Sequence, residues 1–353
     1  MNSPYDFLII GQGLAGSLLY RELAKKGKRV YFIDKFNPSS SSNVAAGIIH
    51  PITGRRIVKT WMADTLIPFA ESTYKEIETQ FNEQLFFRKN ILELIHTAKE
   101  QNDWSMKSSS EEMKNYFSDE KTENLYSDVL ADEPKKISIA QAGWLNVSRM
   151  VQLFRKQLEE NNALLDEDFS HDQLSLNTDG IIYKNIHAEK IIFCEGYHAS
   201  QNPFWKHLPF LPSKGELLTI YSEKLNLDHI ITKTIFLLPL GNHLYKVGST
   251  YSWDELNEVP TEKAKQELTD QLNKIIKVPF EVVDHKAAVR PTVKDRRPFI
   301  GLHPNHPQVG IFNGLGTKGV LLAPYFANHF AEYLVSSAKL LEEVDVKRFS
   351  IKE

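Results

Sequence analysis

The chain has 353 residues, of which 42% are hydrophobic and 25% are charged, and its formal net charge is −3. This composition is typical of a globular protein with two domains or one large one, and the mixed charge gives no indication of a broad surface for nucleic acid or anionic membranes. A single cysteine, Cys194, excludes internal disulfides and cysteine-rich metal sites. No run approaches the roughly 20 apolar residues of a membrane span, and the chain enters its first predicted strand too early for a signal peptide. We therefore expect a cytoplasmic protein without a metal ion.

The first 34 residues have the pattern of a nucleotide-binding βαβ unit. The apolar run Phe7–Ile10 predicts a buried parallel strand, and Gly11-Gln-Gly-Leu-Ala-Gly16 leads into a helix over Leu14–Lys26. In such a motif the glycines allow a tight turn, the approach of a pyrophosphate and close helix packing, while the helix directs free N–H groups at the phosphates. Val30–Ile33 predicts the second strand, and Asp34 ends it as an acceptor for ribose hydroxyls. The pattern predicts dinucleotide binding; the alternative is a structural turn in another α/β protein.

The next part of the chain is predicted to be mainly helical. Residues 38–42 are rich in serine, but they precede the small-residue stretch Val44-Ala45-Ala46-Gly47, so a ligand-covering loop is an alternative to a linker. Apolar residues at helical spacing predict helices over Thr65–Phe81 and Val147–Glu160. Residues 97–135 are polar, and we expect them to be helical and peripheral.

Strands dominate the predictions that follow. A strand over Lys190–Cys194 ends at Glu195-Gly196-Tyr197, which would turn the chain at the ligand edge of a sheet. Branched and aromatic residues then predict antiparallel strands, and a helix is predicted after them. These segments are Glu216–Tyr221, Ile235–Leu238, Leu244–Thr250 and, for the helix, Thr261–Ile276.

A second glycine-rich junction lies near the carboxyl end of the chain. The predicted strand Val309–Leu315 enters Gly316-Thr317-Lys318-Gly319, and a long helix follows from Val320 to Ala338. A simple nicotinamide dehydrogenase has no need for a second junction. A flavin dinucleotide does, because its ring must be held far from its adenine, and a helix amino end there would stabilise negative charge on the reduced ring. The alternative is an ordinary turn.

Five motifs together resemble the D-amino-acid oxidase superfamily of FAD-dependent oxidoreductases, in particular glycine oxidase, sarcosine oxidase and the flavin domain of the bifunctional wobble-uridine tRNA modification enzyme. The motifs are Gly11–Gly16, Ala45–Pro51, Ala142–Leu145, Val289–Gly301 and Leu315–Pro324. The resemblance implies an α/β (α+β overall) fold with a Rossmann-like FAD-binding domain and a second substrate domain built on a mainly antiparallel sheet. It implies that residues 1–80, 145–210 and 290–353 form the first domain and residues 81–144 and 211–289 the second.

The family reaction oxidises a carbon–nitrogen bond by hydride transfer to flavin, and the resemblance implies roles for several side chains. Arg290 corresponds to an arginine that binds the substrate carboxylate, although it could belong to a solvated run of basic residues. Lys246 corresponds to a lysine that promotes reaction with dioxygen, although an outward lysine is an alternative. His50 could face the flavin or bond to backbone, and Tyr251 could line the pocket or pack in the core. Lys59, with Arg56 on one helical face, resembles basic positions close to the flavin ring, although a surface pair is an alternative.

The predicted cofactor-binding residues come from four stretches of the chain. They are Gly11, Gly13, Leu14, Ala15, Gly16, Asp34 and Lys35; Ala45, Ala46, Gly47 and Ile48; Glu195 and Gly196; and Gly314, Leu315, Gly316, Thr317, Lys318, Gly319 and Val320. The family's covalent attachment positions correspond to Ala288 and Val44, so we expect noncovalent FAD. The family's usual Ala-Thr-Gly turn is Cys194-Glu195-Gly196 here, which leaves the contacts of that turn open.

Two other functions remain open at this point. One is flavin-dependent removal of a carboxymethyl group from a modified tRNA wobble uridine, for which tRNA would be the partner in place of a small amine or amino acid. The other is a flavin-binding protein that has lost catalysis. The leading prediction is oxidation of a small amino acid or N-alkyl amino acid, with dioxygen as the electron acceptor.

Overall fold

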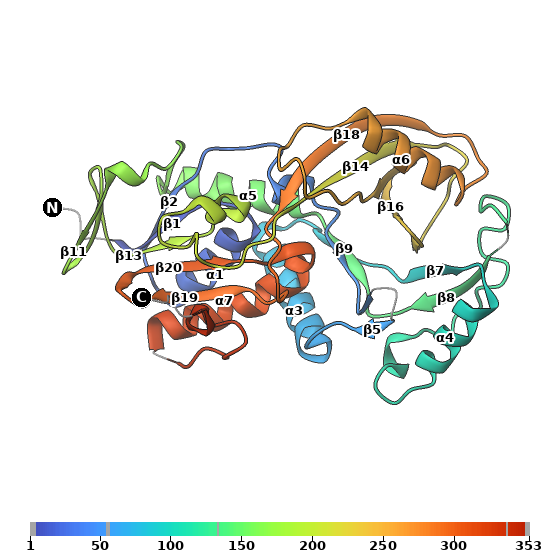
Figure 1. The fold of residues 1–353 in the computed structure, drawn as a ribbon, viewed down its shortest axis with the longest axis horizontal. Coiled ribbons are helices and arrows are strands. Elements are labelled where there is room, and N and C mark those ends of the chain that lie inside the picture. Colours follow the sequence, from blue (N-terminus) through green and yellow to red (C-terminus); the bar gives the residue numbers. More distant parts are fainter. Residues whose placement is uncertain (1–4, 54–56, 133, 337, 350–353) are drawn as a thin grey trace. The chain divides into compact units, whose positions relative to one another are not determined.

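The computed structural model describes residues 5–53, 57–132, 134–336 and 338–349. The chain forms two compact units (Figure 1). Unit 1 comprises residues 1–45, 147–213 and 289–353, and unit 2 comprises residues 46–146 and 214–288. The chain therefore passes from one unit to the other four times. Packing alone defines these units, so the assignment of an FAD domain and a substrate domain stays a prediction.

Unit 1 is built on a mainly parallel sheet. Its strands are β1 (Tyr5–Ile10), β2 (Val30–Ile33), β10 (Leu164–Leu165), β11 (Leu174–Asn177), β12 (Gly180–Tyr183), β13 (Ile186–Phe193), β19 (Phe299–His303) and β20 (His306–Asn313). The strands β10, β2, β1, β13 and β20 are parallel neighbours in that order, while β12 and β19 add antiparallel pairs. The helices are α1 (Leu14–Lys25), α2 (Ser41–Val44), α5 (Val147–Glu160) and α7 (Gly319–Ser336).

Both faces of this sheet are covered, because each face carries its own apolar set. Leu8 and Ile10 of β1 join a buried cluster with Trp205 and Phe299. Side chains alternate along a strand, so β1 presents Phe7 and Ile9 to the opposite face. On that face α1 packs along α7 (Figure 1). A strand that is buried on both sides needs a continuous apolar run, which is why Phe7–Ile10 is wholly hydrophobic.

The carboxyl ends of the parallel strands meet at one edge of the sheet. Ile10 is in register with Ile33 of β2 and with Phe193 of β13, and Phe193 is in register with Ile311 of β20. The segments that follow these strands are therefore neighbours at this edge. In open α/β sheets this is the edge at which ligands bind.

Unit 2 is built on a mainly antiparallel sheet. The order of its strands is β18 (Glu281–Arg290), β14 (Ser213–Tyr221), β17 (Leu244–Gly248), β16 (Phe236–Gly241), β15 (Ile230–Thr232), β7 (Ile91–Ile95) and β8 (Lys135–Ile139), with β15 and β7 as a parallel pair. Helix α6 (Glu262–Asn273) lies beside this sheet (Figure 1). Its Leu268 and Leu272 join a buried cluster with Tyr245 and Val247. Smaller sheets contain β3 (Ile48–Ile49), β9 (Gly143–Leu145) and β6 (Phe86–Arg88), and β4 (Ile52–Thr53) and β5 (Val58–Lys59). The remaining α-helices of the described residues are α3 (Ala63–Phe81) and α4 (Ala98–Ser108).

The expected α/β fold, with a parallel sheet and a second, mainly antiparallel sheet, is confirmed. Helix α5 has the predicted bounds.

The prediction that residues 97–135 are helical is wrong for most of this segment, because helix α4 ends at Ser108 and most of the rest is turn and loop. A capping box, in which Thr97 and Glu100 bond each other's backbone N–H groups, starts α4, but the serines after Lys107 compete for its backbone carbonyls. Within the described ranges, no helix is long and apolar enough to cross a membrane.

Acid should destabilise unit 1 through a group of histidines near the start of β20. Burial, together with the charges of His306 and His207, lowers the pKa of His303 to about 4. A histidine whose pKa is lower in the folded state contributes stability above the unfolded pKa of about 6.5, and that stability is lost as pH falls. Between pH 7 and pH 4 the wild type should lose about 1–3 kcal/mol more unfolding free energy than His303→Gln.

Urea denaturation at the two pH values checks this prediction. The matched control is His187→Gln, which changes an exposed histidine of β13 and should follow the wild type. An equal acid loss in wild type and His303→Gln would show that His303 does not drive the effect.

Candidate functional site

The first glycine turn lies at the carboxyl edge of the parallel sheet. Gly11 has φ +98°, and a Cβ there would lie 2.5 Å from the carbonyl oxygen of Cys194. A Cβ at Gly16 would lie 2.1 Å from the carbonyl oxygen of Gly11. Neither position has room for a side chain, so the strand, turn and helix approach one another as closely as backbone permits.

One serine side chain accepts a hydrogen bond at the amino end of α1. Its N-cap residue, Gly13, has no side chain to bond the first N–H groups. The hydroxyl of Ser42 accepts the Leu14 N–H at 3.0 Å and would lie 2.9 Å from a Cβ at Gly13. The serine-rich segment therefore returns to the start of α1. Ser42 was not among the predicted residues, because nothing in the local pattern places it beside residues 28 positions earlier.

Asp34, the predicted ribose acceptor, is held by two partners. Its Oδ1 accepts the Gln12 N–H at 2.8 Å, and its Oδ2 accepts from Arg155 Nη1 at 2.7 Å. Burial raises the pKa of Asp34, while these two hydrogen bonds and the Arg155 charge act against the increase. Arg155 comes from α5, more than a hundred residues away, and no local sequence pattern connects it with Asp34. Lys35 points elsewhere and pairs with the exposed Asp166 at 3.9 Å.

Hydrogen bonds tie the ends of three strands together at this edge. The Cys194 N–H donates to Ile10 O at 2.7 Å, which joins β13 to β1. Asn313, at the end of β20, donates from Nδ2 to Gly196 O at 2.9 Å and accepts the Gly314 N–H at 2.7 Å. Burial raises the pKa of the Cys194 thiol, which is therefore neutral and unreactive.

The second glycine junction lies beside the first within unit 1. The Gly316 N–H donates to Pro291 O at 3.2 Å, and a Cβ at Gly319 would lie 3.1 Å from Leu14 Cδ2. The amino ends of α7 and α1, which run side by side in Figure 1, therefore meet at the sheet edge. Burial and the charge of Arg296 lower the pKa of Lys318 to about 8.

Unit 2 contains several of the other predicted residues. Gly47 has φ +75° and its carbonyl accepts the Leu145 N–H at 3.0 Å, while Ile48 pairs with Trp144. His50 Nδ1 accepts the Ile52 N–H at 3.2 Å. Of the two roles considered for His50, this contact is the hydrogen bond to backbone.

Lys59 lies in strand β5, so the prediction that it belongs to a helix is wrong. Arg56, its predicted neighbour on one helical face, lies outside the described residues. Lys59 Nζ donates to Asp64 Oδ2 at 2.9 Å. This ion pair raises the pKa of Lys59 and balances its charge.

Lys246 lies on β17 between Tyr245 and Val247, which both pack toward α6. Because strand side chains alternate, Lys246 faces the opposite side of the sheet. Burial lowers the pKa of Lys246 to about 8, and the nearby Lys286 charge acts in the same direction. Tyr251 follows the strand in a loop, is 53% exposed and stacks on Trp253, so the core alternative for this residue is wrong.

Arg290 ends the long strand β18 after the buried residues Ala287, Ala288 and Val289. It precedes Pro291, whose carbonyl bonds Gly316. The strand therefore delivers Arg290 next to the second glycine junction.

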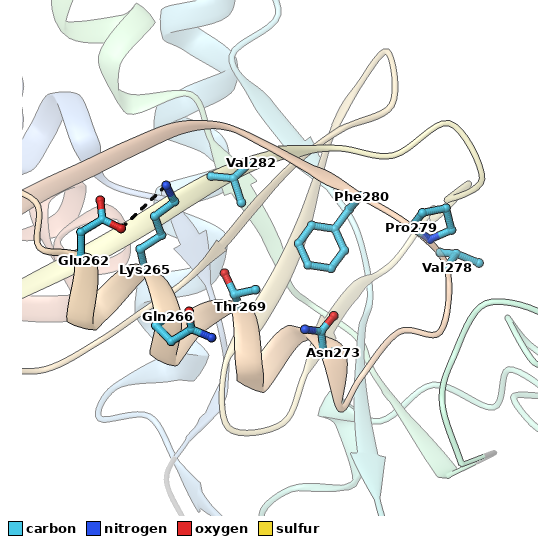
Figure 2. A pocket seen from close by; sticks show the side chains of 9 residues that line it. All are labelled: Glu262, Lys265, Gln266, Thr269, Asn273, Val278, Pro279, Phe280 and Val282. Atoms are coloured by element: carbon cyan, nitrogen blue, oxygen red, sulfur yellow. Dashed lines mark ion pairs between the residues drawn. The ribbon is translucent and has the colours of Figure 1, made fainter.

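A surface groove in unit 2 contains none of these predicted site residues. Figure 2 shows that α6 and the start of β18 form its walls, with polar side chains on the helix and Phe280 on the other side. Its lining residues are Glu262, Lys265, Gln266, Thr269, Asn273, Val278, Pro279, Phe280 and Val282.

Comparison with known proteins identifies the family. The family model described as FAD dependent oxidoreductase, DAO, matches residues 6–333. The chain belongs to this family. It is an FAD-dependent oxidoreductase, as the sequence predicts.

Among curated relatives, a tRNA 5-methylaminomethyl-2-thiouridine biosynthesis bifunctional protein from Marinobacter nauticus is 23% identical over 373 residues, covering 92% of this chain and 54% of that protein. The chain thus spans about half the length of the first relatives it matches. Among solved structures, iminodiacetate oxidase from Chelativorans sp. BNC1 has a TM-score of 0.80 at 20% identity, covering 98% of both chains. Glycine oxidase from Geobacillus kaustophilus has a TM-score of 0.77 at 18% identity, covering 99% of this chain and 98% of its own. These two likenesses show the fold.

The residues at the edge of unit 1 fit a dinucleotide. Two glycine positions exclude any side chain, the start of α1 presents backbone N–H groups, and Asp34 offers a carboxylate at the end of β2. These features suit a pyrophosphate and a ribose. In the described parts of the chain no cluster of three or more histidine, cysteine or acidic residues is arranged to hold a metal ion.

Substitution of Gly16 should prevent cofactor retention. In Gly16→Ala the new methyl group would overlap the Gly11 carbonyl, so the helix must move away from the turn. We expect the purified variant to retain less than about a tenth of the wild-type flavin, a loss of more than about 1.4 kcal/mol in binding free energy. The measurement is flavin absorbance per protein, with circular dichroism to verify folding.

Gly27→Asn is the matched control. Gly27 has φ +73°, no atom lies within 4 Å of the position that a Cβ would take there, and asparagine tolerates that conformation. Full flavin content in folded Gly16→Ala would contradict the assignment of this turn to the cofactor.

Proposed function

We propose that the protein oxidises the carbon–nitrogen bond of a small amino acid or N-alkyl amino acid to an imine, which water then hydrolyses. When bound, FAD supplies the acceptor for the hydride. The observation that supports this substrate class is the position of Arg290 at the end of β18. It directly precedes Pro291, whose carbonyl accepts a hydrogen bond from the Gly316 N–H. The fold shared with glycine oxidase and iminodiacetate oxidase supports the same class.

Arg290 would bind the substrate carboxylate. A guanidinium group bonds both oxygens of a carboxylate and fixes its plane, which orients the neighbouring carbon for reaction. Ala287, Ala288 and Val289 are buried, so the backbone that carries Arg290 is firmly held. A fixed backbone is what a group with a positioning role requires.

Lys246 would supply a positive charge for dioxygen. Its partial desolvation strengthens the field that it exerts, and a cation stabilises negative charge as it develops on oxygen. Lys318 would add a second cation at the second glycine junction. His50 and Tyr251 stay predicted site residues, and Ala288 and Val44 offer no side chain for a covalent bond to flavin, so we propose that FAD is held noncovalently.

Anaerobic titration tests the substrate class. Glycine, sarcosine, iminodiacetate and a panel of D- and L-amino acids are added to the purified flavoprotein, and loss of the visible flavin absorbance is recorded. At least one amino acid should bleach the flavin, and the corresponding amine without a carboxylate should not. A protein that dithionite reduces but no member of the panel reduces would refute the proposal.

Loss of Arg290 should weaken substrate binding. Arg290→Gln removes a charge-assisted carboxylate contact worth about 2–4 kcal/mol, so the substrate Kd should rise roughly 30- to 1,000-fold. Arg290→Lys should recover only part of the loss, because lysine lacks the forked geometry. Lys294→Gln, an exposed change in the same basic run, is the control. If both variants behave alike, Arg290 belongs to a solvated basic face.

Reaction with dioxygen should depend on the charge of Lys246. Lys246→Met should slow reoxidation of the reduced protein by about 100-fold, the magnitude typical of losing one electrostatic contact to developing charge. In the wild type the rate should fall as pH rises through about 8, because Lys246 then loses its proton. Stopped-flow mixing with oxygenated buffer measures both effects. A rate that is unchanged in Lys246→Met would remove this lysine from the site.

The second candidate is removal of a carboxymethyl group from a modified tRNA wobble uridine. The relatives named as tRNA 5-methylaminomethyl-2-thiouridine biosynthesis proteins match 83–92% of this chain, which favours it. This reaction also oxidises a carbon–nitrogen bond next to a carboxylate. Nucleoside analysis of tRNA from a deletion strain separates the two candidates, since accumulation of the carboxymethylaminomethyl nucleoside would support the tRNA reaction and unchanged tRNA would exclude it.

A further inference from the structure

Glu195 is an acidic side chain in a place where a carboxylate is hard to accommodate. It follows β13 at the carboxyl edge of the parallel sheet, and its backbone nitrogen would lie 3.3 Å from a Cβ at Gly11. It therefore adjoins the glycine turn that faces the pyrophosphate of a dinucleotide. An ionised carboxylate at this position would repel an anionic cofactor.

No cation offsets the charge of Glu195 among the described residues. The groups beside it are the neutral Gly11 after β1 and Asn202 after the short helix η3 (Gly196–Gln201), while Asn313 at the end of β20 bonds the adjacent Gly196. His198 bonds the Glu195 carbonyl through its backbone N–H at 3.3 Å, and this residue is exposed. The charge of Glu195 helps to raise the pKa of the Cys194 thiol, which is neutral. Desolvation raises the pKa of Glu195 to about 7, so the acid form is already substantially populated near neutral pH.

A short hydrogen-bond chain determines which oxygen carries the proton. The Phe204 N–H donates to Asn202 Oδ1 at 2.9 Å, which fixes the orientation of the buried amide. Asn202 Nδ2 then donates to Glu195 Oε2 at 2.8 Å. Since Oε2 accepts this hydrogen bond, the proton of the neutral acid belongs on Oε1. The carboxyl group thus has one oxygen held by the protein and an O–H donor on the other.

We propose that Glu195 binds FAD as a neutral acid, donating a hydrogen bond from Oε1 to an oxygen of the cofactor, so that FAD binding is coupled to uptake of one proton. The coupling follows from charge. Binding of a diphosphate beside Glu195 favours the neutral form further, and the carboxyl group takes up a proton from solvent wherever it was ionised in the free protein. This inference rests on the FAD family alone, so it is independent of the substrate.

The affinity of the full-length protein for FAD as a function of pH tests the inference. Above pH 7 the Kd of the wild type for FAD should rise by up to about tenfold per pH unit, since each ionised carboxyl must be protonated on binding. Titration calorimetry at pH 8 in two buffers with different ionisation enthalpies should show close to one proton taken up for each FAD bound. This second readout needs no variant.

Glu195→Gln separates Glu195 from other titrating groups. The amide keeps an acceptor for Asn202 and a donor at the Oε1 position, but it has no charge to titrate. Its Kd should match the wild type at pH 6, be at least about tenfold lower than the wild-type Kd at pH 9, and show no proton uptake. Glu189→Gln, an exposed change on the same strand, should keep the wild-type profile.

Three results would overturn the inference. One is a wild-type protein that binds FAD at pH 8 without proton uptake. Another is a folded Glu195→Gln variant that retains the wild-type dependence on pH. The third is an affinity that increases with pH, which would mean that Glu195 accepts a hydrogen bond from a cofactor hydroxyl as a carboxylate.

Discussion

At the end of β1 the backbone of the glycine turn packs directly against the backbone of neighbouring segments, with no side chain between them. The rest of unit 1 depends on this close packing. Gly11 approaches the Cys194 carbonyl and Gly16 approaches the Gly11 carbonyl, each at a distance that leaves no room for a Cβ. This contact brings the amino end of α1 to the edge where β1, β2, β13 and β20 end together. Helix α7 then packs along α1 and brings its own glycine junction to the same edge. The two junctions are therefore consequences of one packing arrangement.

The features that the sequence predicts well are those determined over short distances along the chain. The strand, turn, helix and second strand within the first 34 residues follow from apolar runs and glycines, and α5 follows from its apolar spacing. Predictions weaken where a partner is distant. In strand β18 the buried residues are Ala287, Ala288 and Val289, and the residues before them show no regular alternation of polar and apolar side chains that would predict a strand. Residues 97–135 contain good helix formers but too few apolar residues to pack a long helix.

The site residues divide in the same way. Gly11, Gly16 and Asp34 are recognisable because their spacing is local. Ser42 and Arg155 are not, since a serine or an arginine has no signature until the fold brings it to the Leu14 N–H or to Asp34. Arg155 changes the expected role of Asp34. An arginine and a backbone N–H hold the carboxyl group and oppose the rise in pKa that burial causes, so its orientation is fixed before any ribose binds.

Asp34 and Glu195 lie at the same sheet edge and burial raises the pKa of both, yet their hydrogen-bond partners differ. Asp34 has a cation at 2.7 Å and a backbone donor, which support the carboxylate that a ribose hydroxyl needs as its acceptor. Glu195 has an amide partner and no cation within the described chain, which favours the neutral acid beside the turn that faces phosphate. Two acids at one edge can thus serve two different polar groups of a single ligand. Their neighbours, more than the residue type, determine which acid accepts a hydrogen bond and which donates one.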